Sequence, residues 1–83
     1  MKRTLTLLPL SRSRIGPIVG TGPITQYEVS GLLPGQEASI ANFGTEDQHS
    51  WRIFRVKDGI DTGWIGDHKT AEDALAILQK EID

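Results

Sequence analysis

The chain has 83 residues, of which 37% are hydrophobic and 24% charged, with a formal net charge of −2 and no cysteine. A chain of this length forms one small domain, here residues 1–83, and buries only about 60–65% of the surface that its unfolded form exposes. The absence of cysteine excludes a disulfide scaffold, a zinc ribbon and a thiol enzyme. No apolar run approaches the roughly 18 residues of a membrane span, and the apolar stretch that ends at Pro9 is too short for a signal peptide. We therefore expect a cytoplasmic protein.

The charges are unevenly distributed along the chain. Residues 1–27 carry four basic residues and no acidic one, whereas residues 28–83 carry five basic and eleven acidic residues. A basic arm of this kind contacts phosphate or an acidic partner, or lies over the acidic part of its own chain. Exposed ion pairs are weak, and the sequence leaves both alternatives open.

The first quarter of the chain combines a strand signal with a breaker-rich segment. Residues 3–8 alternate Thr and Leu, which predicts a strand, and Pro9 ends this strand or marks a sheet edge. Residues 9–24 contain three prolines and three glycines, so we expect a long loop there. Loops of this length are uncommon in compact domains unless they are mobile or functional.

A first hairpin is predicted over residues 25–43. Residues 25–30 alternate polar and apolar side chains, and residues 37–43 form a less regular returning strand. Pro34 and Gly35 fit the central positions of a type II turn, because proline presets φ and glycine supplies a positive φ.

A second hairpin follows the polar loop 44–50. Residues 51–57, Trp-Arg-Ile-Phe-Arg-Val-Lys, give the strongest strand signal in the chain. Asp58 and Gly59 form a favourable hairpin turn, and residues 60–66 return.

The chain ends in a predicted helix. Thr70 fits the N-cap, with Asp73 at the third helical position. An apolar stripe with spacings of three and four follows, comprising Ala71, Ala74, Leu75, Leu78 and Ile82 with Ile77 beside it. The order β-loop-ββ-ββ-α predicts an α+β domain in which an antiparallel sheet of about five strands, a meander or a half-barrel, packs on one C-terminal helix.

The second hairpin also predicts which residues share a sheet face, because a loop of two or four residues pairs positions of opposite parity. One face is then largely aliphatic, so we expect the helix to cover it; it comprises Arg52, Phe54, Val56, Asp61, Gly63 and Ile65. The opposite face carries both tryptophans and two bases, namely Trp51, Ile53, Arg55, Lys57 and Trp64.

The face with both tryptophans has two interpretations. The N-terminal strand and the apolar residues of the 15–24 segment cover it, or it is a surface for a partner protein, because Trp and Arg dominate interface hot spots. The second interpretation gives Trp51, Ile53, Arg55 and Trp64 as candidate partner-binding residues. Self-association is one form of it, since a second copy can complete a small domain with an unfilled sheet face.

Nucleic-acid binding is the alternative function. Arg12 and Arg14 in the basic arm, together with Arg55 and Lys57 beside the tryptophans, combine phosphate contacts with a stacking surface. An isoelectric point near 5.6 disfavours this function, because nucleic-acid-binding domains usually carry a net positive charge.

No residue pattern indicates catalysis or a cofactor. His49 and His68 have no spacing typical of metal ligands, and Ser50 points away from its neighbour His49 if both lie on a strand. The carboxylates of Glu72 and Asp73 suit the positive start of a helix. We therefore expect a non-enzymatic protein without metal, cofactor, membrane partner or small-molecule substrate.

Two short segments resemble known families. Residues 27–35 resemble the strand and turn of fibronectin type III domains, although Ala38 stands where that family has tyrosine, and their Leu-Pro-Gly turn is similar to one in RNA-binding barrels of the TRAM type. Residues 51–75 resemble small bacterial β–β–α modules and, in outline, the three-stranded DNA-binding domains of integrases. Each similarity covers a small part of the chain, so we assign no family.

Overall fold

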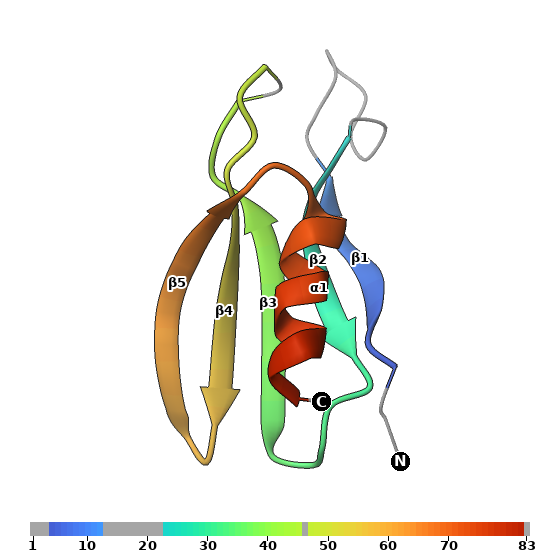
Figure 1. Cartoon of the computed structure of the whole chain (residues 1–83), viewed down its shortest axis with the longest axis vertical. Helices are drawn as coiled ribbons and strands as arrows, with labels where there is room; N and C mark the ends of the chain where they lie inside the picture. Colours follow the sequence, from blue (N-terminus) through green and yellow to red (C-terminus); the bar gives the residue numbers. More distant parts are fainter. Residues whose placement is uncertain (1–3, 13–22, 46, 83) are drawn as a thin grey trace.

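The computed structural model describes residues 4–12, 23–45 and 47–82 and confirms the predicted fold class. Five antiparallel strands form one sheet in the order β1-β2-β3-β4-β5, and a single helix follows (Figure 1). The sheet is an open meander rather than a half-barrel. The elements are β1 (Thr6–Arg12), β2 (Ile24–Ser30), β3 (Gln36–Asn42), β4 (Trp51–Lys57), β5 (Ile60–His68) and α1 (Ala71–Ile82).

The first strand differs from the prediction at both ends. It begins at Thr6 and continues through Pro9 to Arg12, so four residues of the expected 9–24 loop belong to β1, and Ile24 already belongs to β2. Proline is tolerated there because β1 is an edge strand, and the pairing with β2 shifts register between Pro9 and Ser11. Residues 13–22 of the expected loop lie outside the described residues.

Both predicted hairpin turns are confirmed. Between β2 and β3, the Gln36 N–H donates to the Leu33 carbonyl at 3.0 Å, and Gly35 has a φ of +83°. Between β4 and β5, Asp58 and Gly59 have φ values of +54° and +79°. Two successive positive φ values are typical of a type I′ turn, whose twist matches that of the strands.

Helix α1 packs along β3 on one face of the sheet (Figure 1). The predicted N-cap is confirmed, because the Asp73 N–H donates to Thr70 Oγ1 at 3.0 Å. The Leu5 N–H donates to Gln79 Oε1 at 2.8 Å, which links the chain before β1 to the helix. The shared core joins small alanines to larger apolar residues, namely Leu5, Val29, Ala38, Ile40, Trp51, Ile53, Ala71, Ala74 and Leu78.

The helix covers the face opposite to the expected one. We predicted that it packs on Phe54 and Val56, but Trp51 and Ile53 are only 6% and 3% exposed, in the core cluster that α1 completes. On this face Ile40 of β3 adds to Trp51 and Ile53, so the helix buries a larger apolar surface here, which explains the difference. The sequence prediction considered the second hairpin alone and left β3 out.

A β-bulge in β5 moves Trp64 to the other face. Next to the turn, Val56 pairs with Asp61 as expected, but Phe54 pairs with Trp64, so β5 contains one extra residue between these pairs. Gly63 lies in this stretch with a φ of +68°, a conformation that glycine adopts without steric cost. Trp64 therefore lies beside Phe54, on the face without the helix.

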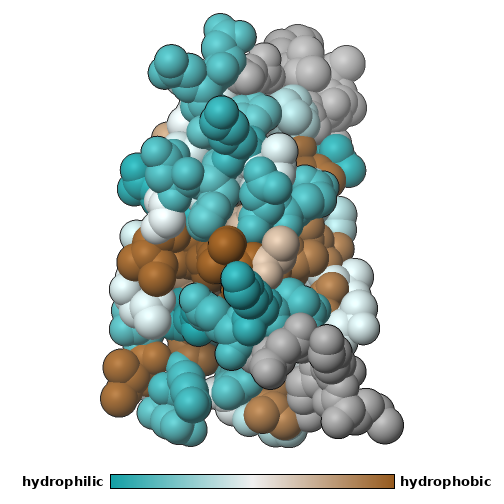
Figure 2. All heavy atoms as spheres, viewed as in Figure 1, coloured by the Kyte–Doolittle hydropathy of each residue, from teal (hydrophilic) through white to brown (hydrophobic). Residues whose placement is uncertain are grey.

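The surface on the helix side is mainly hydrophilic. Figure 2 shows hydrophilic side chains over most of this view and a band of hydrophobic groups across its middle. Within the described residues, no helix is long and apolar enough to cross a membrane.

Candidate functional site

The sheet face without the helix, called the open face below, is built from alternate residues of all five strands. The strand pairings place Leu8, Glu28, Ser39, Phe54 and Trp64 in one row across the sheet. A neighbouring row contains Gln26, Ala41 and Arg52. The open face thus comprises Leu8, Gln26, Glu28, Glu37, Ser39, Ala41, Phe43, Arg52, Phe54, Val56 and Trp64.

Three rings on the open face form an aromatic cluster, Phe43, Phe54 and Trp64. The Trp64 ring centroid lies 5.1 Å from that of Phe43 and 5.3 Å from that of Phe54, with tilted planes. The Arg52 guanidinium carbon lies 4.9 Å from the Phe43 ring centroid. These are favourable distances for aromatic pairs and for a cation over a ring. The rings therefore hold one another in place before any partner binds.

The aromatic cluster is accessible to a partner. Phe43 is 50% exposed, and Phe54, Trp64 and Arg52 are half-buried. An unpartnered sheet face usually carries polar residues toward water. Three rings at such positions form an apolar surface. Its removal from water by a partner would lower the free energy.

Long and short side chains stand side by side on the open face. The aromatic side chains of β4 and β5 stand beside the short side chains of Ser39 and Ala41 on β3. Ala41 is only 8% exposed although it faces away from the helix, because larger neighbouring side chains cover it. The face therefore differs in side-chain size from strand to strand.

The charges on the open face have mixed signs. The Glu28 side chain is exposed in the same row as the cluster, and Glu37 is exposed on β3 opposite Val56. The Arg52 Nε is buried and has no hydrogen-bond acceptor among the described residues. The open face therefore combines an arginine that lacks a full set of acceptors with exposed carboxylates one or two strands away.

The structure does not bring the four predicted partner-binding residues together. Trp51 and Ile53 are buried in the core with α1, and Arg55 forms an ion pair with Glu81 at the end of the helix. Trp64 lies on the open face. The bulge in β5 explains this error, since it places Trp64 on the opposite side from the other three.

The residues predicted for nucleic-acid binding do not form one basic patch either. Arg55 and Lys57 belong to the helix side of β4, and both line a cavity beside α1. Arg12 is at the end of β1, three strands away from β4. Arg14 lies outside the described residues.

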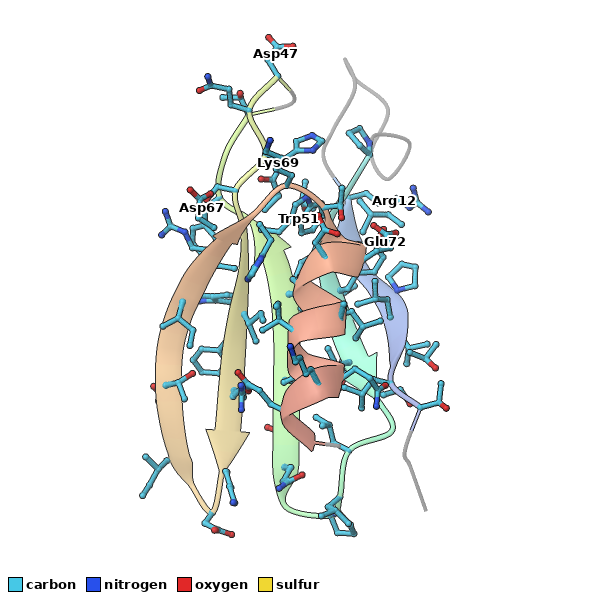
Figure 3. The ribbon with its side chains drawn as sticks, in the orientation of Figure 1. Arg12, Asp47, Trp51, Asp67, Lys69 and Glu72 are labelled. Atoms are coloured by element: carbon cyan, nitrogen blue, oxygen red, sulfur yellow. The ribbon has the colours of Figure 1, made fainter. Side chains whose placement is uncertain are left out.

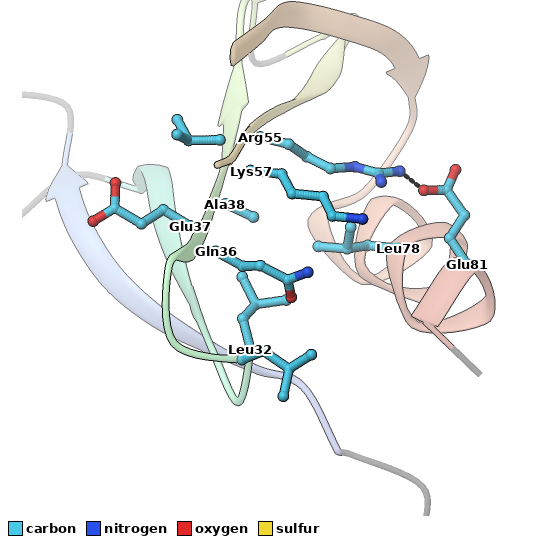
Figure 4. Close-up of a pocket in the computed structure, with 10 residues that line it drawn as sticks. Leu32, Gln36, Glu37, Ala38, Arg55, Lys57, Leu78 and Glu81 are labelled. Carbon is cyan, nitrogen blue, oxygen red and sulfur yellow. Dashed lines mark ion pairs between the residues drawn. The ribbon is translucent and has the colours of Figure 1, made fainter. Parts of the chain in front are cut away.

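The cavity beside α1 is a weaker candidate site. It has a volume of about 340 Å³ and lies between the β2–β3 turn, β4 and the end of α1. Lys57 and Gln36 extend along it beside Leu78, and the Arg55–Glu81 ion pair closes one side (Figure 4). Its volume is near the lower limit for ligand sites, about 300 Å³, and Glu81 already balances the charge of Arg55.

Both histidines lie near Trp51, which itself lies beside the start of α1 (Figure 3). The His49 ring is edge-on to the Trp51 ring at 6.3 Å, and His68 is the cross-strand neighbour of Trp51. Among the described residues, no three His, Asp or Glu side chains are grouped so that they could hold a metal ion. His49 therefore packs against the indole, and His68 is its neighbour through the strand pairing.

Sequence reasoning missed Phe43, Phe54 and Arg52 as members of the candidate site. It placed Phe54 beneath the helix and treated Phe43 as the end of a strand. The available signal was the pair of glycines in β5, Gly63 and Gly66, because glycine inside a strand often marks a bulge. Both have positive φ, +68° and +99°.

Comparisons with models of protein families, with curated proteins and with solved structures found no match. The chemistry of the open face is therefore the basis of the functional proposal.

Proposed function

We propose that this chain is a small non-enzymatic module that binds another protein through the open face of its sheet. The observation that carries this proposal is the aromatic cluster with Arg52 beside it, half-exposed on the face that α1 leaves uncovered. Aromatic residues and arginine are enriched at the centres of protein interfaces. We also propose a cytoplasmic location, since a chain without cysteine forms no disulfide and needs no oxidising compartment.

The rigidity of the aromatic cluster supports binding. Immobilising a flexible side chain at an interface costs about 0.5–1.5 kcal/mol. Trp64 contacts the rings of both Phe43 and Phe54 in the free protein, so much of this ordering has already taken place. Most of the favourable free energy of burying the rings then contributes to binding.

Nucleic-acid binding is the second candidate, because exposed rings beside an arginine also suit stacked bases. The carboxylates of Glu28 and Glu37 are exposed on the same face and would repel phosphates. Affinity for nucleic acid depends mainly on phosphate neutralisation by Lys and Arg. A protein partner therefore fits the open face better.

Affinity capture with immobilised variants tests the proposed function. The wild type is compared with Trp64→Ala and with Ile60→Ala, a control at the β4–β5 turn whose side chain is 74% exposed. We expect a protein that is retained by the wild type and by Ile60→Ala and is lost with Trp64→Ala, identified by mass spectrometry. Melting curves of each variant show that the fold is kept, and Phe43→Ser serves as a second cluster variant.

Two results would count against the proposal. Identical sets of retained proteins for all variants would show that the aromatic cluster contacts no partner. Binding of a single-stranded oligonucleotide that weakens steeply with salt and is lost with Trp64→Ala would favour nucleic acid instead.

A further inference from the structure

We infer that the partner of the open face is a second copy of this chain, packed face to face about a twofold axis that runs parallel to the strands between β3 and β4. This inference rests on the proposed function and names its partner. A twofold interface brings the same surface of each copy together, so that surface must be complementary to itself. The open face has this property in both shape and charge.

The shape match follows from the strand register. Rotation about an axis between β3 and β4 keeps each residue in its row and places β4 of one copy over β3 of the other. Phe54 pairs with Ser39 and Arg52 pairs with Ala41 within the sheet. In the dimer, Phe54 of each copy therefore lies over Ser39 of the other, and Arg52 lies over Ala41. In each direction, two long side chains then face two short ones across the interface.

Other positions of the axis match less well. An axis along β4 would place Phe54 directly against Phe54 of the second copy. Long side chains that meet end to end leave gaps beside them. Close packing of two sheet faces needs side chains that interdigitate across a layer about 10 Å thick. The position between β3 and β4 provides this in the two rows that contain Ser39 and Ala41.

The charge match involves the outer strands of the same arrangement. The axis places β5 of one copy over β2 of the other, so Trp64 lies over Glu28, whose side chain is exposed in the same row. The indole N–H is a donor and the carboxylate an acceptor. Arg52 is one row away from this Glu28 and long enough to approach it, and the twofold repeats each contact.

The size of the overlap predicts a weak dimer. Strands lie about 4.8 Å apart and rise about 3.4 Å per residue, so four overlapping strands of seven residues cover on the order of 450 Å² in each copy. The total of roughly 900 Å² is below the about 1,200–2,000 Å² of stable specific complexes and in the range of weak, transient ones. We therefore expect monomers and dimers to exchange at micromolar concentrations.

Sedimentation equilibrium with charge-reversed variants tests the dimer. Over a range from about 5 to about 500 µM, the mass of the wild type should rise from that of one chain, 9.1 kDa, to that of two. Glu28→Arg alone and Arg52→Glu alone each oppose like charges in the dimer, so each should raise the dissociation constant at least about tenfold. An equimolar mixture of the two variants should restore association, because each contact then has opposite charges.

Lys57→Glu is the matched control, since it reverses a charge on β4 but on the helix side. It should leave the dissociation constant within about twofold of the wild type. Far-UV circular dichroism verifies that every variant is folded.

Three results would overturn this inference. They are a wild type that stays monomeric over the whole range, a mixture that associates no better than its separate components, and a Lys57→Glu variant as weakened as the other two. The proposed function fails separately, in the capture experiment. A monomeric chain that retains a Trp64-dependent protein partner rejects the second copy and keeps protein binding.

Discussion

Replacing Ile53 by alanine tests which face of the sheet α1 covers. Ile53 is 3% exposed and belongs to the core cluster with Ile40 and Leu78. The substitution removes about three carbon groups, each worth about 0.8 kcal/mol of burial, and leaves a cavity that adds to the loss. We expect the free energy of unfolding to fall by about 3–4 kcal/mol, a large part of the roughly 4–12 kcal/mol typical of a domain of this length.

Ile65→Ala is the matched control, because Ile65 is the cross-strand partner of Ile53. It is the same residue type but is 49% exposed, so its truncation removes about half as much buried surface and opens no closed cavity. We expect a loss of about 1 kcal/mol. The corresponding melting temperatures should fall by about 12–32 °C for Ile53→Ala and by about 4–8 °C for Ile65→Ala.

Urea unfolding followed by far-UV circular dichroism measures both losses. The protein concentration must be in the low micromolar range, since association would add to the apparent stability. A loss for Ile65→Ala as large as that for Ile53→Ala would refute the packing described here. So would a loss for Phe54→Ala greater than that for Ile53→Ala, because the helix would then cover the open face.

Three further substitutions test local features of the fold by the same urea unfolding. Thr70→Ala removes the acceptor of the Asp73 N–H and should cost about 1 kcal/mol, whereas serine at this position should keep most of the stability. Gly31→Ala should cost more than Gly59→Ala, because both have positive φ but only at Gly31 would a Cβ lie 2.6 Å from a backbone oxygen; equal losses would contradict this. Glu81→Gln should change stability by less than about 1 kcal/mol, since its ion pair is well exposed, and a larger loss would show that the pair is more important than its exposure indicates.

The sequence predicts the features of this fold that depend on a few neighbouring residues. Pro34 with Gly35, and Asp58 with Gly59, define their turns within four positions, and Thr70 defines the start of α1 in the same way. Such signals are local because backbone φ preferences and short hydrogen bonds fix them. The number and order of the strands follow from the turns.

The candidate site could not be predicted in the same way, because it depends on register over a whole hairpin. A one-residue shift moves every later side chain to the other face, and the shift near Gly63 separates Trp64 from Trp51. A glycine in a strand fits a regular ladder as well as a bulge. The contact between Phe43 and Trp64 joins residues 21 positions apart, which no local pattern encodes.

The two edges of the sheet are consistent with the proposal that association uses its face. Edge strands pair with further strands when they offer a regular row of backbone groups. Pro9 has no N–H and stands next to a register shift in β1, and the β4–β5 pairing shifts register twice, where Gly63 and Gly66 have positive φ. Both edges are therefore poor templates for another strand. The bulge that interrupts the β5 edge also places Trp64 in the aromatic cluster, so the same local distortion disfavours pairing at the edge and builds the surface proposed for binding.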